Sequence, residues 1–514
     1  MNIFSGKHAL RNILLLALGV RLLAVLFARG YLMHDDHFLT VEPAGSWAAG
    51  HNFNDWLPGI GNDRTSPEPV SFLYPGFLFL FFKLFSLAGV DNPEYQMYLM
   101  RLVHALYSLL VVYFGFKITE NIGTRKQAIR VGLMLALIAI LPNFSVRNLV
   151  EMACIPPLMA GFYLLTTPRS SNETDAPPRP GAIVFAAILM GLAVGFRYQA
   201  VLIAAGVGWV LLWRKFWWQA IAFGLVSFAA FFLSQIDDVL LWGGKPFQHL
   251  QGYFEYNQTH AGQYPGSPYT YLSFIGLFIL PPVSIFLLAG FFKMYRKQWL
   301  IFFPVLLFLL FHIIYPNRQE RFILPALPFV VILGIMGWDE ILATSKFWIR
   351  NEKLNRWSWR VFWSVNILAM LFMCFVYGKK SRVESMIYLY DQPDYRNFIQ
   401  DFSYSDDGAM LPQFYSGKWT SYYVFRKSTD FDHDIVRFPD YEKISAGKLA
   451  TRPQPNYVLF VNDDQLEMRV ERLRKFFPTL EYRATIEPGW MDKLLNRLNK
   501  YNTVERIFIY HIPG

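Results

Sequence analysis

The sequence predicts a polytopic α-helical membrane protein with a small α/β domain at its C-terminal end. The 514-residue chain is 54% hydrophobic and only 17% charged, whereas a soluble protein of this size needs more charge to cover its surface. The apolar residues are gathered in runs, several of which meet or approach the roughly 20 residues that a spanning helix needs. Beyond residue 378 the chain becomes polar and charged.

Eleven apolar segments are predicted to span the membrane. They lie near residues 9–30, 97–118, 127–145, 149–167, 181–196, 199–214, 217–234, 271–292, 298–315, 322–342 and 359–377. The first lacks a convincing small-residue cleavage site and contains Arg21, so we expect an uncleaved helix rather than a signal peptide. Segment 72–88 is apolar but contains Tyr74-Pro75-Gly76 and Lys83, and we interpret it as an interfacial helix.

The distribution of charge predicts the orientation. If the N-terminus lies inside, every inside loop carries at least two basic residues, for example Arg214 and Lys215, as the positive-inside rule requires. The first outside loop, residues 31–96, is instead acidic. We therefore expect a membrane module over residues 1–378, with a cytoplasmic N-terminus and this loop on the extracytoplasmic side.

Residues 379–514 are predicted to form a soluble extracytoplasmic α/β domain. Tyr457–Val461 has the pattern of a buried strand, Gln465–Phe477 that of a helix, and Arg506–His511 that of a final strand. A segment of roughly 130 residues is a usual domain size.

Charge and cysteine content exclude two other classes. The net charge of +10 does not indicate nucleic-acid binding, because the basic residues lie at the ends of apolar runs and form no basic stripe or nucleic-acid motif. The two cysteines, Cys154 and Cys374, lie inside apolar segments, which excludes a disulfide scaffold.

An acidic segment follows the first predicted span. Asp35 and Asp36 are adjacent, flanked by His34 and His37, and Glu42 follows shortly after. One of the carboxylates could take the proton of an acceptor hydroxyl in a group transfer. The acids and histidines could instead hold a divalent metal, or simply begin a solvated loop.

Arginines occur at the outer ends of predicted spans, where the positive-inside rule does not expect them. Arg318 and Arg321 lie between two spans and could bind a phosphate group, or contact lipid headgroups. Arg197 lies between two nearly contiguous spans and needs an anionic partner, either a ligand or a structural acid. Arg147 and Glu151 have i,i+4 spacing and are interpreted as a structural pair.

The predicted outside loop 235–270 contains Asp237, Asp238 and Lys245. It also has a glycine-containing aromatic run that includes Tyr264. Such a loop suits a sugar or lipid headgroup, although an interfacial aromatic belt has the same composition. His104 and His312 lie within spans and are interpreted as hydrogen-bonded core histidines.

Six motifs in order along the chain resemble those of the GT-C superfamily, and within it glycosyltransferase family 22. Asp35-Asp36-His37-Phe38 through Glu42-Pro43 is similar to the family's D-E-x-F-x-x-x-E-P signature. The other similar segments are Arg64-Thr65-Ser66, Tyr74-Pro75, Arg147 to Glu151, Asn317 to Phe322 and Leu411 to Ser416. The family includes the mannosyltransferases of GPI-anchor and N-glycan precursor assembly.

The chain departs from this family pattern in two places. The His, Lys and Glu of the H-K-E motif are Asn317, Arg318 and Gln319, and the family's Cys-His after Pro412 is missing. Arg318 keeps the positive charge that a phosphate needs. The departures suggest a distant, bacterial member of the family. The net charge and the absence of eukaryotic sorting motifs favour a bacterial inner membrane.

The resemblance implies an inverting transfer of a mannosyl or other hexosyl residue from a polyprenyl-phosphate donor to a glycan or glycolipid acceptor. Asp35 would be the general base, and Asp36 would orient the acceptor or share the role of base. The remaining substrate-binding residues would be Arg318, Arg321, Arg197, Glu42, Arg64, Lys245 and Tyr264. No cofactor or metal is expected, and the partners would be these substrates and membrane lipids, not nucleic acid.

Three other functions compete with this one. A polyprenyl-phosphate-dependent transferase of another sugar, such as arabinose or glucose, would have the same residues. A transporter or flippase of lipid-linked sugars commonly shows repeated halves, and the sequence shows no such repeats. A non-catalytic scaffold leaves the acidic pair and the arginines unexplained.

Overall fold

The chain folds into two compact units. The computed structural model describes residues 6–53, 56–57, 68, 70–167, 177–262, 266–402, 410–426, 453–498 and 504–513. The first unit comprises Met1–Ala28, Asp55–Phe77 and Met100–Phe375, and the second comprises Arg29–Asn54, Leu78–Leu99 and Val376–Gly514.

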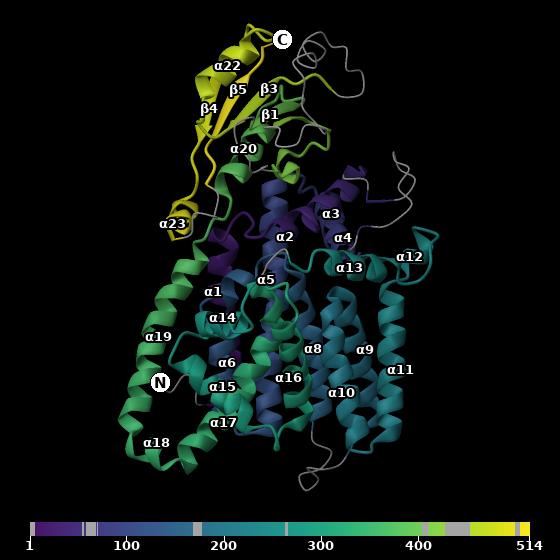
Figure 1. Cartoon of the computed structure of the whole chain (residues 1–514), viewed down its shortest axis with the longest axis vertical. Coiled ribbons are helices and arrows are strands. Elements are labelled where there is room, and N and C mark those ends of the chain that lie inside the picture. The colour runs from purple at the N-terminus through teal and green to yellow at the C-terminus, as the bar shows by residue number, and fades with distance from the viewer. Residues whose placement is uncertain are drawn as a thin grey trace. The chain divides into compact units, whose positions relative to one another are not determined.

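The first unit is built from helices (Figure 1). In chain order they are α1 (Ala9–Phe27), α4 (Leu73–Leu87) and α5 (Pro93–Ile122), both shared with the second unit, α6 (Arg125–Leu137), α7 (Leu141–Phe144), α8 (Val150–Thr166), α9 (Pro180–Phe196), η3 (Tyr198–Ala200), α10 (Val201–Trp213), α11 (Trp217–Ser234), α12 (Asp237–Leu240), α13 (Gln248–Thr259), α14 (Thr270–Ile279), α15 (Val283–Lys293), α16 (Trp299–Ile314), η4 (Glu320–Ala326), α17 (Leu327–Thr344), α18 (Lys346–Arg350) and α19 (Glu352–Cys374).

Most of the predicted spans coincide with helices. Among the described residues, five helices are long and apolar enough to cross a membrane, or six if the bent pair α14–α15 counts as one span. The five are Ala9–Phe27, Pro93–Ile122, Trp217–Leu240, Glu320–Thr344 and Glu352–Cys374. Shorter apolar helices cover other expected spans, including Val150–Thr166 and Trp299–Ile314. The total of eleven spans stays a prediction.

The predicted span at residues 127–145 is not one continuous helix, because the helix is interrupted. α6 ends at Leu137, Ile138 is extended, and α7 begins only at Leu141. The fully buried Asn366 of α19 serves the interrupted backbone, since its amide donates to Leu137 O at 2.7 Å and its Oδ1 accepts from Ala139 N at 2.9 Å. A side chain that satisfies both groups removes the cost of breaking a helix away from water.

Arg21 lies within α1 and is almost fully buried. Its guanidinium donates to the carbonyls of Leu135 at 3.4 Å and Ala136 at 3.3 Å, in the last turn of α6. Its Nε donates to Ser108 Oγ at 2.7 Å. A cation at a helix C-terminus is favourable because the unsatisfied carbonyls there carry partial negative charge. Arg21 therefore joins α1 to the end of α6.

The predicted span at residues 271–292 is also formed by two helices rather than one. α14 and α15 meet at an angle of 115°. The break falls at Leu280, whose φ is +62°, and the prolines Pro281 and Pro282 follow it. A non-glycine residue in the left-handed region and two residues without an N–H donor cannot continue the helix.

Helices α15 and α17 pack closely along a stripe of glycines. A Cβ on Gly290 would collide with the carbonyl oxygen of Gly334 and lie 2.7 Å from Trp338 N, and one on Gly337 would collide with the backbone of Gly290. Helices in membranes commonly associate through such small residues, which let the backbones approach. Beside this contact, the ring of Phe286 stacks on Trp338 with a centroid distance of 4.1 Å.

The second unit contains a five-stranded mixed sheet with helices on it (Figure 1). The strands run in the order β2-β1-β3-β5-β4, with β1 parallel to β2 and β3, and β5 antiparallel to β3 and β4. The elements are α2 (His34–Phe38), α3 (Val41–Ala48), α20 (Lys380–Tyr390), β1 (Phe398–Phe402), η5 (Gln413–Ser416), β2 (Tyr423–Arg426), β3 (Tyr457–Val461), α22 (Leu466–Arg474), β4 (Glu481–Ile486), α23 (Trp490–Leu498) and β5 (Ile507–His511).

The sheet confirms the α/β prediction for the C-terminal residues. β3 is buried over its whole length, and α22 and β5 lie where a helix and a final strand were expected. One face of the sheet and α22 share an apolar core that includes Ile399, Val458, Phe460 and Leu473. Strand β3 occupies the centre of the sheet, which explains why its sequence is continuously apolar.

We expect Gly290→Ala to destabilise the first unit by about 1–3 kcal/mol, because the new methyl group has no space beside α17. The measurement is the midpoint of thermal unfolding of the purified protein in detergent. Gly208→Ala in α10 is the matched control, since nothing lies within 4 Å of its added Cβ. Equal midpoints for both variants would contradict the close contact of α15 and α17.

Candidate active site

The structure divides the predicted site residues between the two units. Asp35, Asp36 and Glu42 belong to the second unit, and Arg197, Arg318, Arg321 and Lys245 belong to the first. Arg64 and Tyr264 lie outside the described residues.

The acidic segment begins at a tight backbone contact in the second unit. Gly30 has φ of +69° and pairs with Gly378 in a parallel bridge. A Cβ at Gly30 would collide with the carbonyl oxygen of Gly378, so the residue must be glycine on both counts. After this contact the chain turns into α2. Asp35 and Asp36 occupy its first turn, where negative charge is favourable.

A buried pair fixes the turn from α2 to α3. His37 Nε2 lies 2.9 Å from Glu42 Oε1, and both side chains are at most 1% exposed. The same carboxylate oxygen accepts a hydrogen bond from Phe414 N of η5 at 3.1 Å. The imidazole of His37 is stacked between the rings of Tyr31, at 4.9 Å, and Tyr415, at 5.6 Å. Glu42 and His37 thus link α2, α3 and η5, and they have a positioning role.

Asp35 and Asp36 differ in exposure. The Asp35 side chain is partly exposed, whereas Asp36 is 6% exposed. The backbone carbonyl of Asp36 accepts a hydrogen bond from Thr40 Oγ1 at 2.5 Å. Burial raises the pKa of Tyr31, so the phenol that stacks on His37 stays neutral. Nearby, Arg382 of α20 binds Glu505 with Nε 2.9 Å from Oε2. Of the two aspartates, Asp35 is the more exposed to solvent.

The basic residues of the first unit meet at a buried carboxylate. Glu151 is fully buried in the first turn of α8, and its Oε1 lies 2.9 Å from Arg197 Nη1 and 3.5 Å from Arg321 Nε. Arg197 reaches this position because α9 ends at Phe196 and the chain is extended at Arg197 before η3. Arg321 comes from η4 and also donates to Gln319 Oε1 at 2.9 Å.

Two guanidinium groups around one carboxylate leave an excess of positive charge. Arg197 is 7% exposed, yet no acceptor in the described part of the chain bonds its Nε or Nη2. Its guanidinium lies over the ring of Phe322 at 4.6 Å. The rings of Tyr271 and His312 complete the aromatic surroundings, and the His312 ring lies 6.1 Å from Tyr271 and 6.4 Å from Phe322. Buried N–H donors without acceptors are expensive, which suits a site that receives an anion.

Arg318 makes different contacts from Arg321. It donates to the carbonyls of Gly266, of Pro316 at 3.4 Å and of Ile313 at 3.0 Å, close to the end of α16. These bonds give Arg318 a role at a helix C-terminus. The contact of Arg318 with a phosphate group stays a prediction. Arg147, which was paired with Glu151 on sequence spacing, donates to Asn143 Oδ1 at 3.4 Å.

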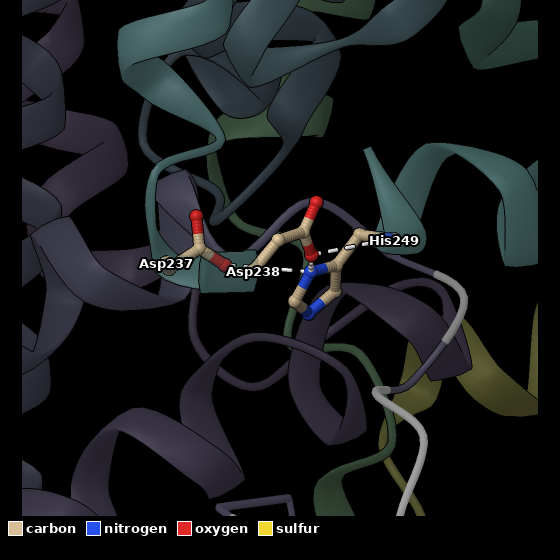
Figure 2. Close-up of side chains that lie close together, drawn as sticks. All are labelled: Asp237, Asp238 and His249. Carbon is tan, nitrogen blue, oxygen red and sulfur yellow. Dashed lines mark hydrogen bonds and ion pairs between the residues drawn. The ribbon is translucent and has the colours of Figure 1, made fainter. Parts of the chain in front are cut away.

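Asp237, Asp238 and His249 form the group of possible metal ligands within the described residues, with ligand atoms that lie within 4.8 Å of one another. Figure 2 shows Asp238 beside the imidazole of His249. Asp238 Oδ1 accepts from His249 Nδ1 and from its backbone N at 3.2 Å, and Asp237 Oδ2 lies 3.4 Å from the same ring nitrogen. As it stands, this is a buried aspartate–histidine pair at the start of α13. A cation would have to displace the ring's bond to Asp238.

Sequence reasoning found most residues of these clusters but missed two of their relations. Glu151 was paired with Arg147 because they share a helix period, and its contacts with Arg197, at the end of α9, and Arg321, in η4, were not anticipated. His249 was not selected, although it follows Asp237 and Asp238 in the same loop. His312 was expected to be a hydrogen-bonded core residue, and its Nδ1 does contact Phe308 O at 2.8 Å. Lys245 is exposed between α12 and α13.

The fold is similar to those of two membrane glycosyltransferases. ArnT from Cupriavidus metallidurans matches with a TM-score of 0.59 in its apo state, at 14% identity over 98% of this chain and 97% of ArnT. The ArnT structure bound to undecaprenyl phosphate matches at 0.57, with 12% identity over 98% of both chains. AglB, an oligosaccharyltransferase from Archaeoglobus fulgidus, in complex with an inhibitory peptide and a dolichol-phosphate, matches at 0.53, with 10% identity over 94% of this chain and 73% of AglB.

These likenesses show the GT-C fold of multi-pass integral membrane proteins. The chain belongs to the Alg9-like mannosyltransferase family, which is glycosyltransferase family 22, because the sequence model of that family matches residues 12–402. The protein is therefore a membrane glycosyltransferase. A search of curated protein sequences found no match.

We expect Glu151→Gln to destabilise the protein by about 3–5 kcal/mol, because it leaves two guanidinium groups buried without their carboxylate. Thermal unfolding in detergent measures the loss. The double variant Glu151→Gln/Arg321→Gln restores the original balance of charge, so it should be more stable than the single variant. Glu120→Gln, which removes a partly exposed carboxylate from Lys117 and Arg125, should cost less than about 1 kcal/mol. A double variant less stable than Glu151→Gln would contradict the proposed charge balance.

Proposed function

We propose that this protein transfers a mannosyl residue from a polyprenyl-phosphate-linked donor to a hydroxyl group of a glycan or lipid-linked acceptor, with inversion at the anomeric carbon. The transfer takes place on the extracytoplasmic side, where the acidic segment and the C-terminal domain are expected to lie. The N-terminus and the basic loops then face the cytoplasm, as the positive-inside rule predicts. The donor class is the part of the proposal that family membership and the basic cluster support together.

The basic cluster around Glu151 carries the proposal. A polyprenyl-phosphate donor releases its lipid phosphate when the sugar leaves, and the leaving oxygen gains negative charge in the transition state. Hydrogen-bond donors of the protein that are already fixed in place stabilise this charge without reorganisation and so lower the barrier. Arg197 offers two buried donor nitrogens, Nε and Nη2, that have no acceptor among the described residues, and Arg321 adds a second guanidinium. A guanidinium can bind two phosphate oxygens at once, and Arg318 adds a further positive charge.

The solved structures support the class of donor. ArnT is described bound to undecaprenyl phosphate, and AglB in complex with a dolichol-phosphate. Both ligands are long isoprenoid lipids that carry a phosphate group. A ligand of this class suits the present chain, because its first unit has a buried cationic cluster around Glu151. The arginines supply positive charge directly, so the proposed transfer needs no divalent metal.

Asp35 is proposed to be the general base. Its carboxylate takes the proton of the acceptor hydroxyl while the hydroxyl oxygen attacks the anomeric carbon from the face opposite the phosphate. The bond from that carbon to the phosphate oxygen breaks, and its electron pair leaves with the lipid phosphate. The charges balance, because the proton passes to Asp35 and the negative charge passes to the phosphate. Asp36 orients the acceptor, and Glu42 acts through His37 by holding the turn that carries both aspartates.

We expect Asp35→Asn to lower the rate of transfer by roughly 10²–10⁴-fold, the usual contribution of a positioned general base, while the melting temperature stays unchanged. The assay uses purified protein in nanodiscs, radiolabelled polyprenyl-phosphate-mannose, a panel of acceptors, and buffers with and without chelator. Asp91→Asn, which neutralises an exposed carboxylate of the same unit, is the matched control. Full activity of Asp35→Asn would rule out the base, and a loss caused by chelator would rule out the metal-independent mechanism.

If the wild type transfers glucose or arabinose from the corresponding donor but not mannose, the donor sugar is wrong and the site assignments remain. If the protein moves the lipid-linked sugar across the bilayer without transferring it under any condition, the glycosyltransferase mechanism itself is overturned. The two outcomes are separated by measuring product formation and lipid movement in the same vesicles.

A further inference from the structure

A second cationic feature of the first unit lies where α10 and α15 end and α11 and α16 begin. The two turns enclose a pocket of about 540 Å³, which is within the usual size of small-ligand sites. We call it the basic turn pocket. Its cations are Arg214, Lys215 and Arg296, and its aromatic walls are Trp213, Tyr295, Trp299 and Phe303.

The charge of the basic turn pocket has one sign. None of the described residues that line it is acidic. Glu340 is the carboxylate that the α15–α16 turn contacts, and it binds Lys297 at 2.6 Å and Lys293 at 3.7 Å, neither of which lines the pocket. Two helices end and two begin at these turns, so their dipoles largely cancel and the side chains set the potential. The pocket therefore attracts an anion.

The aromatic residues contact the cations of the pocket and indicate that the pocket lies at the membrane–water interface. The guanidinium of Arg214 lies over the ring of Trp299 at 4.5 Å, and that of Arg296 lies over Tyr295 at 5.1 Å. Trp213 and Trp217 are each 59% exposed. Exposed tryptophans at the ends of apolar helices are typical of the membrane–water interface, where the ring sits among lipid headgroups.

The basic turn pocket is separate from the Glu151 cluster. α10 begins just after Arg197 and ends just before Arg214, and its 13 residues correspond to about 20 Å of helix. The neighbouring α16 runs the other way, from the pocket to the segment that carries Arg321. A Cβ on Gly206 of α10 would lie 2.5 Å from the Cα of Pro304, so these two helices are in close contact. The pocket thus lies at the far end of both helices from the proposed donor phosphate.

We propose that the basic turn pocket binds the phosphodiester headgroup of an anionic phospholipid. This site goes beyond the proposed transfer and lies in the cytoplasmic leaflet under the orientation given above. Basic pockets between membrane helices on that side commonly bind anionic headgroups. The aromatic walls and exposed tryptophans favour a ligand that enters from the bilayer with its acyl chains along α10 and α11.

Binding is tested on the full-length protein by native mass spectrometry from a zwitterionic detergent, with dioctanoyl phosphatidylglycerol as the probe. Dioctanoyl phosphatidylcholine has the same chains without the net charge, and inorganic phosphate has the charge without the chains. We expect saturable binding of one phosphatidylglycerol, at least 10-fold weaker binding of phosphatidylcholine, and no competition by equimolar inorganic phosphate. Equal competition by inorganic phosphate would show a soluble anion site and overturn the lipid assignment.

The triple variant Arg214→Gln/Lys215→Gln/Arg296→Gln should weaken phosphatidylglycerol binding about 100-fold, since each cation near an anionic headgroup contributes about five-fold in affinity. The matched control, Lys346→Gln/Arg350→Gln/Lys353→Gln, removes the same charge from exposed residues that do not line the pocket. Its binding should change less than about three-fold.

Equal losses in the two triple variants would show only general attraction to the charged surface and would overturn the pocket. If the pocket triple variant fails to fold, Lys215→Glu replaces it, because Lys215 is exposed and its reversal changes the local charge by two. That single variant should weaken phosphatidylglycerol binding by roughly 30-fold. Unchanged binding would overturn the proposal.

Discussion

The interaction on which the first unit depends is the buried contact of Glu151 with Arg197 and Arg321. It joins the first turn of α8, the junction of α9 and η3, and η4, which are segments far apart in the chain. A buried charge is tolerated only when it is paired, and in a membrane protein an ionisable residue of this kind commonly has a function. One carboxylate orders two arginines without neutralising both. The same contact therefore maintains the fold and prepares a place for an anion.

The same requirement explains the irregular parts of the structure. Breaks in helices are possible in an apolar environment only where protein groups satisfy the released N–H and C=O groups. Asn366 does so where α6 stops, and Arg21 binds the carbonyls in the last turn of that helix. In the second unit, the buried His37–Glu42 pair serves the turn between α2 and α3 and holds η5 through Phe414 N. Buried polar groups thus place the irregular segments that carry the candidate site residues.

Hydrophobic runs predicted where helices lie, because a helix that spans the membrane needs about 20 mostly apolar residues. They did not predict the interruption at Ile138, since that residue is apolar and leaves the run unbroken. The interruption at Leu280 does have a signal in the sequence, Pro281 and Pro282, which hydrophobicity alone does not register. Tertiary pairing was also hidden: Glu151 has an arginine at helical spacing in Arg147, and that local signal concealed its partners some 46 and 170 residues further along. The acidic and basic candidates could be named from residue type and family resemblance. Their exposure and partners required the fold.

The central claim is that the Glu151 cluster keeps positive charge for a lipid phosphate. The most direct measurement compares the melting temperatures of the wild type and Arg197→Gln with undecaprenyl phosphate and with undecaprenol, which share a chain and differ in the phosphate. A ligand that binds only the folded state raises the melting temperature. We expect undecaprenyl phosphate to raise it by a few degrees in the wild type and much less in Arg197→Gln, with little effect of undecaprenol on either. Equal stabilisation by both lipids, or an undiminished shift in Arg197→Gln, would contradict the claim.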